Sequence, residues 1–517
     1  MSIVSNLNYS PELVEDVVYD VCIIGAGAVG IYTASNLIHN NSLAIVEAGD
    51  SKYNQELESE FVPSFSNMKY RGATVGRSFR FGGTTSKWSG QLLPFLKFDK
   101  HDCDEKTRDS WGHLINICDM YSETVREKIL KNNKTSSFEN FVHNSASKYY
   151  FNRIREKLGF TILTSEWLNP YKRNLTWMLS KAVKNSTKSH LFLNTVASDF
   201  TSSNERKENI NSIKVVVQGE YFHIRAKKFI ICSGAIEGTR SLLNLYENMG
   251  YKNDNLGRFL SDHISINIGS ISAKDGKKIR SVFNPIFQGS NMRTFRIVRN
   301  DEDTRQKYFI SFLFRYNENP GFNLLNFFIN YFNSRNKIQF KDLRLFKSIS
   351  GLLKITFSKF FLKRLYIPPN EKIDVLLDFE QSREYDNCIR LINERDSFGN
   401  KKANIEWKVS KQDYSKFQKI GEDFVDKWNE EFKDSLIVKA DIEYTDIKPY
   451  DVYHPVGTCM ISNSKTSVVD LDFKVKNIDN IFVINSGVIP SASIANPTFS
   501  LFCFSEYVVK KYFKNEK

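Results

Sequence analysis

Two polar residues near the C-terminal end, His454 and Asn496, have the chemistry of a proton acceptor and a hydrogen-bond donor. His454 stands in the run Tyr453-His454-Pro455-Val456-Gly457, and Asn496 begins the run Asn496-Pro497-Thr498. A neutral imidazole accepts a proton near physiological pH, and a carboxamide can hydrogen-bond an oxygen that is losing its proton. A single histidine is more often structural, so the rest of the sequence must decide whether these two residues form a site.

The N-terminal part of the chain has the pattern of a nucleotide-binding βαβ unit. The apolar run Asp20–Ile24 predicts a buried strand, and Ile31–Leu37 predicts a helix. Between them lies the glycine-rich stretch 25–30, and Leu43–Val46 predicts a second strand that ends at Glu47. A strand, glycine loop, helix, second strand and terminal acid in this order are typical of a dinucleotide site, whereas the loop alone would be weak evidence.

Each glycine of this stretch has a separate expected role. Gly25 permits the tight turn, Gly27 lets the backbone approach a pyrophosphate, and Gly30 lets helix and strand pack closely. The helix N-terminus offers free N–H groups and the positive end of its dipole to the phosphates. Glu47 is placed to accept hydrogen bonds from ribose hydroxyls.

Further apolar runs extend the predicted parallel sheet. We expect strands at Phe192–Phe200 and Ser212–Ile224, separated by a polar turn. Lys228–Ala235 predicts a buried strand that runs into the turn at Gly234, and Ile236–Leu245 predicts the helix that follows. The stretch from 121 to 194 has a charged, helical pattern.

A second glycine-rich loop, Arg80 to Gly90, contains Gly82, Gly83 and Thr84. Consecutive glycines with hydroxyl neighbours bring backbone N–H groups close to a flat or anionic ligand. Taken alone, the loop is equally consistent with a flexible surface segment.

The segment from Arg335 to Arg364 is basic and amphipathic. It contains nine Lys or Arg residues and one acid, Asp342, and its apolar residues recur at steps of three and four. Two interpretations stay open: a helix of a cap domain with a solvated basic face, or an element that contacts an anionic membrane or ligand.

The composition and the absence of certain sequence motifs narrow the class of protein, its partners and its location. The chain has 517 residues, a net charge of +13 and seven scattered cysteines without metal-ligand spacing, which favours a reduced, cytoplasmic protein without a metal centre. Without zinc-finger spacing or an RNA-binding signature, we expect no nucleic-acid partner. Neither a signal peptide nor a transmembrane run is apparent, so we expect a cytoplasmic location, with peripheral contact at the inner face of an anionic membrane as the alternative.

Five blocks in order resemble the glucose–methanol–choline (GMC) oxidoreductases. They are 25–30 with Glu47, the Gly82-Gly83 loop, Ala226 to Leu243, Asn255 to His263, and Tyr453 to Thr498. The blocks span residues 20 to 510, and the stretch from about 270 to 375 matches weakly.

The resemblance implies FAD as the cofactor, bound by residues from all parts of the chain. The implied cofactor-binding residues are Gly25, Gly27, Ala28, Gly30, Glu47, Gly82, Gly83, Thr84, Val196, Gly234, Asn485, Ser486, Pro497 and Thr498. It further implies that His454 and Asn496 face the flavin N5, so that His454 takes the hydroxyl proton while hydride leaves the carbon. His263 is interpreted as structural or as a cap contact.

Two departures from the family pattern matter. Lys87 stands where some relatives attach the flavin through histidine, which favours non-covalent FAD. Asn485 stands where the family usually has Asp, which would change the electrostatics beside the flavin.

The resulting expectation is an α/β fold with two domains. A Rossmann-like FAD-binding domain with a parallel sheet would comprise 15–100, 190–270 and 446–517, and an α+β substrate or cap domain with an antiparallel sheet would comprise 101–189 and 271–445. The expected activity is oxidation of a CH–OH group in a sugar-like or polyol alcohol. The glycine loop resembles that of pyranose-oxidising members, and the basic segment suggests a sugar carried on an anionic lipid.

Two alternatives stay open: a flavin-retaining lyase, or a membrane-surface binding protein with a vestigial flavin. The electron acceptor is not predicted.

Overall fold

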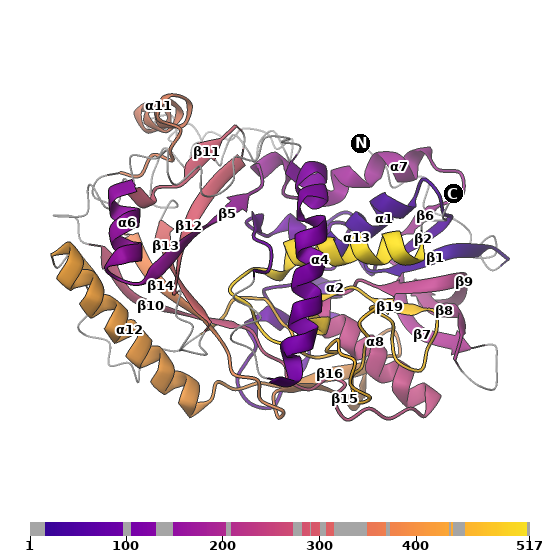
Figure 1. Cartoon of the computed structure of the whole chain (residues 1–517). Helices are drawn as coiled ribbons and strands as arrows, with labels where there is room; N and C mark the ends of the chain where they lie inside the picture. Colours follow the sequence, from indigo (N-terminus) through magenta and orange to yellow (C-terminus); the bar gives the residue numbers. More distant parts are fainter. Residues whose placement is uncertain are drawn as a thin grey trace.

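The computed structural model describes most of the chain. The described residues are 16–96, 105–130, 148–202, 208–271, 282–289, 291–299, 307–314, 349–368, 373–433, 436–437 and 450–513. Two large sheets lie side by side, the first on the right of Figure 1 and the second on the left.

Among the described residues, the first sheet has seven strands in the order β6-β2-β1-β9-β8-β7, with β19 also paired to β9. Its strands are β1 (Val18–Ile24), β2 (Leu43–Val46), β6 (His190–Phe192), β7 (Val196–Ser202), β8 (Ile210–Val217), β9 (Glu220–Ile231) and β19 (Ile481–Val483). The strands β6, β2, β1, β9 and β19 pair in parallel, whereas β7, β8 and the first half of β9 form an antiparallel extension. The predicted nucleotide-binding βαβ unit is therefore present, and its carboxyl strand ends lie at one edge.

Two strand predictions in this region are wrong. The run 212–224 is not one strand, because the chain reverses at Gln218 and Gly219, which have φ of 52° and 87°. Strand β9 then continues into the run predicted separately at 228–235 and ends at Ile231. The run 192–200 is divided between β6 and β7 at Asn194, whose φ of 51° interrupts extended backbone. Left-handed backbone is a local turn feature that apolar periodicity does not reveal.

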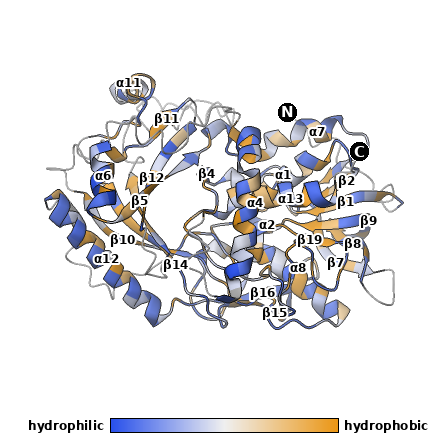
Figure 2. Cartoon of the chain, in the orientation of Figure 1, coloured by the Kyte–Doolittle hydropathy of each residue, from blue (hydrophilic) through white to orange (hydrophobic). Residues whose placement is uncertain are grey.

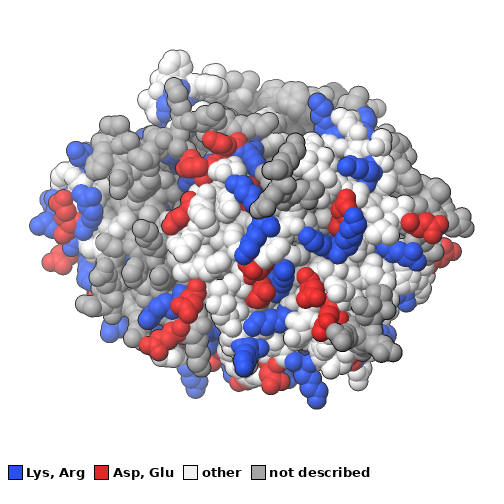
Figure 3. All heavy atoms as spheres, turned by 45° about the vertical axis from the view of Figure 1, so that its right-hand side comes forward, with Lys and Arg blue, Asp and Glu red and all other residues white. Residues whose placement is uncertain are grey.

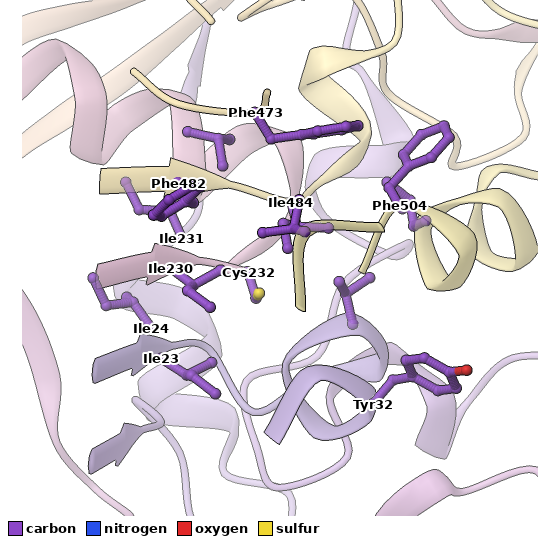
Figure 4. Packing of buried hydrophobic residues seen from close by; sticks show 14 of the residues in the cluster. Ile23, Ile24, Tyr32, Ile230, Ile231, Cys232, Phe473, Phe482, Ile484 and Phe504 are labelled. Carbon is purple, nitrogen blue, oxygen red and sulfur yellow. The ribbon is translucent and has the colours of Figure 1, made fainter. Parts of the chain in front are cut away.

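Helices from both ends of the chain cover the first sheet. They are α1 (Ala28–Leu37), α4 (Glu105–Leu130), α8 (Gly234–Met249) and α13 (Pro497–Tyr512). Tyr32 of α1 stacks on Phe502 of α13 with 4.6 Å between ring centroids, and its hydroxyl donates to Glu506 at 2.7 Å. Figure 4 shows the apolar packing between these helices and the strands. This packing holds the segment of Asn496 beside the N-terminal glycine loop.

In the part of the chain that the structure describes, the second sheet has nine strands, and its strand pairs are antiparallel. Its main order is β17-β10-β14-β13-β12-β5-β4, with β11 paired to β12 and β18 paired to β10. The strands are β4 (Gln91–Leu92), β5 (Phe160–Trp167), β10 (His263–Ile271), β11 (Ile286–Gln288), β12 (Asn291–Arg299), β13 (Tyr308–Phe314), β14 (Ile373–Glu380), β17 (Leu436–Ile437) and β18 (Tyr450–Asp451). The strand β5 lies in the stretch 121–194 that the charge pattern predicted to be helical, so that prediction is wrong there.

Smaller elements complete the fold. The helices α6 (Lys148–Glu156) and α12 (Lys411–Phe432) pack on the second sheet through buried side chains such as Phe151, Phe424 and Trp428. In Figure 2 the first sheet is mostly hydrophobic in colour, whereas α12 carries many hydrophilic residues. The remaining helices and strands are α2 (Gln55–Glu60), α7 (Ser180–Asn185), α11 (Ile349–Phe357), β3 (Ser64–Phe65), β15 (Cys388–Arg395) and β16 (Lys401–Glu406).

The predicted fold class is confirmed: a parallel, Rossmann-like sheet with helices stands beside an antiparallel sheet with its own helices. The domain boundaries stay a prediction. The strands β4, β10 and β18 pair within the second sheet, although their residues fall in the segments assigned to the first domain.

Candidate active site

A cavity of about 1040 Å³ lies at the carboxyl ends of the parallel strands and extends along the second sheet. This volume is at the upper end of the range for small-ligand pockets, roughly 300–1,000 Å³. The predicted site residues that line it are Gly25, Gly27, Ala28, Glu47, Gly83, Thr84, Val196, Gly234, His454, Ser486, Asn496, Pro497 and Thr498. The structure thus brings together residues from the beginning, middle and end of the sequence.

One end of the cavity has the features of a dinucleotide cradle. Helix α1 begins at the glycine loop, and its N-cap Gly27 provides no side-chain cap, so the first N–H groups face the cavity without that partner. A Cβ at Gly27 would have no protein atom within 4 Å, which leaves open space for a pyrophosphate. Glu47 follows β2 and accepts from the N–H groups of Ala26 at 2.8 Å and Gly49 at 3.2 Å, which aims its carboxylate at the same space. These residues fit the ADP half of FAD.

The second glycine loop lies directly against the first. A Cβ at Gly83 would approach the Cα of Gly27 to 2.8 Å, and the N–H of Gly82 donates to the carbonyl of Ala26 at 3.0 Å. Both Gly82 and Gly83 have positive φ, which favours glycine. The loop is therefore packed against the cradle and is not a free surface segment.

Three predicted cofactor-binding residues do not line the cavity. Gly30 is enclosed, because a Cβ there would lie 1.8 Å from the carbonyl oxygen of Gly25. Gly82 lies beneath the side chain of Asn174. The carboxamide of Asn485 accepts from the N–H of Gly487 at 2.9 Å and turns its nitrogen toward Gly238 of α8, and Asn485 is not among the residues that line the cavity.

His454 is held through its backbone. Its N–H donates to both carboxylate oxygens of Asp262, at 2.9 and 3.1 Å, and Asp262 also accepts from the N–H of His263 and the hydroxyl of Tyr70. Burial raises the pKa of Asp262 well above its usual range. The Asp262-His263 block, which the sequence placed far from His454, thus positions the imidazole.

The ring of His263 meets that of His454 edge to face, with 5.5 Å between centroids, and both rings line the cavity. His454 Nδ1 and His263 Nε2 are buried and have no hydrogen-bond partner in the part of the chain that is described. Because Nδ1 of His454 is enclosed, Nε2 is its ring nitrogen available to a ligand. His263 therefore belongs to the wall of the site, beyond the structural role expected from the sequence.

Asn496 is the N-cap of α13, yet its side chain makes no capping bond. Its Oδ1 instead accepts from Nη2 of Arg296 at 2.8 Å, and its Nδ2 donates to Oε1 of Gln91 at 3.3 Å. Since arginine is only a donor, this contact fixes which end of the amide is oxygen and leaves one N–H of Nδ2 for a ligand.

Arg296 itself was not predicted. It is 4% exposed, donates to the carbonyl of Ile494 at 2.6 Å and lies over the ring of Phe309 at 4.2 Å, and its Nε has no partner among the described residues. Burial lowers its pKa to about 10. The sequence signal was weak, because Arg296 is one of three arginines in the run Asn291–Arg299, although it stands between the apolar residues Phe295 and Ile297.

Three more polar residues continue from Arg296 across the second sheet. Ser311 pairs with Arg296 in register, Asp378 accepts from the Ser311 hydroxyl at 3.0 Å, and Ser265 pairs with Asp378. All four residues line the cavity and are called the polar row below. Burial raises the pKa of Asp378, against the opposing effect of Arg296.

The electrostatics of the site keep His454 neutral. Burial, followed by the positive charge of Arg296, lowers the pKa of His454 to about 3. The pKa of His263 is lowered well below its usual value, first by burial and then by His454, Arg296 and Lys307. Two imidazoles beside a cation therefore stay unprotonated and can accept hydrogen bonds throughout the physiological pH range.

Two further expectations concern ions and membranes. No cluster of metal-ligating side chains occurs among the described residues, and no described helix is long and apolar enough to span a bilayer. Of the basic segment 335–364, residues 335–348 lie outside the described part, while 349–364 include α11 and a π-helical turn, η9 (Ser358–Leu362).

Two comparisons with known protein sequences found similar proteins. Residues 384–504 match the model of a family described as GMC oxidoreductase. A segment of 58 residues is 36% identical to pyridoxine 4-oxidase of Microbacterium luteolum, and this match spans 11% of the chain and 10% of the length of that relative.

The whole fold resembles solved structures of two enzymes. One is pyridoxine 4-oxidase from Mesorbium loti, with a TM-score of 0.59 at 12% identity over 96% of this chain and 100% of that one. Another is a formate oxidase, with a TM-score of 0.58 at 14% identity over 96% and 98%. A variant of the formate oxidase of Aspergillus oryzae RIB40, described for its effect on FAD modification, matches with a TM-score of 0.59 at 14% identity over 96% and 98%. The resemblance to the GMC oxidoreductases drawn from the sequence is thereby confirmed, and these distant structures establish the fold.

Proposed function

We propose that this relative of the GMC oxidoreductases binds FAD and oxidises a CH–OH group of a polyol or sugar-like alcohol. The observation that carries the proposal is a single cavity lined by two sets of residues. Gly25, Gly27 and Glu47 form a dinucleotide cradle, and His454 and Asn496, which both interact with Arg296, line the same cavity.

FAD, when bound, would accept the hydride from the substrate carbon. Gly27 and the N-terminus of α1 would hold the pyrophosphate, Glu47 the ribose, and Gly83 with Thr84 would lie along the ring system. Lys87 points its amine to the carbonyl of Arg77 at 3.0 Å, and with no histidine at this position we propose non-covalent attachment.

Residues of the protein would accept the hydroxyl proton and stabilise the substrate oxygen. Nε2 of His454 accepts the hydroxyl proton, because the low pKa keeps the imidazole neutral. The free N–H of Asn496 Nδ2 donates to the same oxygen as its negative charge develops, in the manner of an oxyanion donor. Arg296 fixes the amide for this task through its bond to Oδ1. A proton and a hydride leave together, so the alcohol becomes a carbonyl.

The polar row supports a substrate with several hydroxyl groups. Ser265, Asp378, Ser311 and Arg296 present donors and acceptors side by side along one wall of the cavity. A buried donor or acceptor without a partner costs about 1–3 kcal/mol, so a wall of such groups favours a ligand that pairs with them. Among the described residues, Oγ of Ser265 and Nε of Arg296 have no partner, and an alcohol with one hydroxyl and an apolar body would leave at least one of them unpaired.

The test is anaerobic addition of polyols, pyranoses and simple alcohols to the purified flavoprotein, followed by its absorption spectrum. We expect loss of the oxidised flavin band with a polyhydroxylated substrate. His454→Asn should keep the flavin and lose the reduction, while His39→Asn, at an exposed surface site, should behave as wild type. A spectrum that stays oxidised with every alcohol contradicts the proposal.

The alternatives predict other outcomes in the same experiment. A flavin-retaining lyase would turn over substrate without any change in the flavin spectrum. A binding protein with a vestigial flavin would keep its ligand affinity in His454→Asn. The neutral His454 and the fixed Asn496 favour catalysis over a binding role, and the flavin spectrum separates oxidation from the lyase reaction.

A further inference from the structure

The end of α11 and the turn η9 expose a group of large apolar side chains. Each is more than half exposed, and Phe361 reaches 74%. The exposed residues are Leu353, Phe357, Phe360, Phe361 and Leu362, called the apolar tip below. Figure 1 shows α11 at the upper left, standing out from the body of the molecule. Proteins that stay monomeric in water rarely expose contiguous apolar groups of this size without a partner.

The base of the tip is fixed to the second sheet. Ile355 and Leu365 are buried and pack with Phe287 and Met292. The N–H of Phe287 donates to the carbonyl of Lys363 at 2.7 Å, and that of Leu365 donates to Pro285 at 2.8 Å. Phe357 and Phe361 stack on each other at 4.9 Å. The segment is thus fixed to the second sheet by packing and backbone hydrogen bonds, while its phenyl rings are exposed. This arrangement is typical of a membrane anchor that inserts its apolar side chains into a bilayer.

The charged residues within the segment that carries the tip are all of one sign. Residues 349–368 include Lys354, Lys359, Lys363 and Arg364 and contain no Asp or Glu. On the face drawn in Figure 3, by contrast, acidic and basic side chains are interspersed. Basic residues among aromatic and aliphatic ones are typical of elements that lie in the interface of an anionic bilayer. A second copy of this chain would bring like charges together, which disfavours self-association through the tip.

The tip also lies beside the rim of the cavity. Met292, which packs on Ile355 and Leu365, lines the cavity, as does Leu313 of β13, which is 48% exposed. A protein docked through the tip would therefore place this side of the cavity near the bilayer surface, where an alcohol carried on a lipid is accessible.

We propose that residues 349–364 dock the protein on anionic membranes, with the apolar tip in the interface and Lys354, Lys359 and Lys363 at the lipid headgroups. The proposal goes beyond the oxidation chemistry and does not depend on it.

Flotation of the flavin-loaded protein with vesicles tests the docking. We expect binding to vesicles of phosphatidylcholine with about 30% phosphatidylglycerol, weaker binding as salt rises, and little binding to pure phosphatidylcholine. Phe360→Ser/Phe361→Ser should weaken binding at least about tenfold, and Lys359→Gln/Lys363→Gln should weaken it at low salt. The matched control Tyr171→Ser/Tyr221→Ser removes two exposed aromatic residues elsewhere and should bind as wild type.

Several outcomes overturn the proposal. Failure to bind anionic vesicles at low salt does so, as does unchanged binding by Phe360→Ser/Phe361→Ser. A dimer in gel filtration that dissociates in this variant would assign the tip to a second copy. Flavin reduction by a soluble alcohol, measured in parallel, separates the two proposals, because the tip variants should retain it whatever the vesicle result.

Discussion

The protonation state of His454 gives the sharpest test of the proposed chemistry. An ordinary histidine has a pKa of about 6.5, so at pH 5 about 3% of it is neutral. With the pKa lowered to about 3 by burial and Arg296, about 99% of His454 is neutral at the same pH. A lowered pKa extends the range of the neutral, proton-accepting form of His454 to lower pH.

We therefore expect the acid limb of the pH profile of kcat/KM to lie far below pH 6.5, where an ordinary histidine would place it. Between pH 8 and 5, kcat/KM for an alcohol that reduces the flavin should change little from titration of His454, whereas a base of pKa 6.5 would lose about 30-fold. Replacement of Arg296 by Met removes the nearby positive charge, so the pKa of His454 should rise and the acid limb should move to higher pH.

Histidine NMR gives the same information without a substrate. The chain has eight histidines, and selective ¹³C labelling of their Cε1 atoms, with His454→Asn to identify the signal, would follow the titration directly. We expect the His454 signal to stay at its neutral position down to pH 5. Titration near pH 6.5, together with a 30-fold fall in kcat/KM across the same range, would refute the burial and charge reasoning used for this site.

Three further predictions concern the cofactor cradle and the amide. Gly30→Ala should unfold or strongly destabilise the first sheet, because the Cβ would lie 1.8 Å from a backbone oxygen, whereas Gly27→Ala, with no atom within 4 Å, should keep its circular dichroism but lose FAD. Burial raises the pKa of Glu47 to about 7, so FAD affinity of the cofactor-free protein should fall about tenfold from pH 8 to 6 as the carboxylate is protonated, and titration calorimetry of Glu47→Gln should show no such dependence. Asn496→Ala should slow flavin reduction about 10²-fold, which is about 2.7 kcal/mol, and stopped-flow rates for Asn496→His should fall less if an N–H donor is what matters.

The parts of the fold that local rules determine could be predicted from the sequence. The strand Leu43–Val46 was predicted with the bounds that β2 has, because an apolar run between polar turns leaves one interpretation. The turn at Gln218 was missed because strand-forming runs flank it on both sides, although the adjacent Gly219 was an available turn signal. The strand β5 was missed because the charged residues around it suggested a helix, while its pairing with β12 is decided by residues far away in sequence.

For the candidate site too, some features could be predicted from the sequence and others could not. Glycine loops could be located because their backbone requirements appear as residue types, and Gly25, Gly27 and Gly83 indeed line one cavity. The orientation of Asn485 could not be predicted, since its contact with Gly238 depends on how α8 packs. A motif fixes where a residue is placed in the fold more reliably than the direction of its side chain.

Arg296 shows what the weakly matched middle of the chain contributes. It lies 200 residues from Asn496, yet it donates to the amide oxygen at 2.8 Å and also lowers the pKa of His454. A buried guanidinium with an unpartnered Nε is costly, and a hydrophobic residue of similar size would pack there at less cost. The cost is explained if one cation both orients the amide and keeps the imidazole neutral. The second sheet would then set the chemistry at His454 as well as form a wall for the substrate, and Arg296→Met should change both the pH profile and the rate at the plateau.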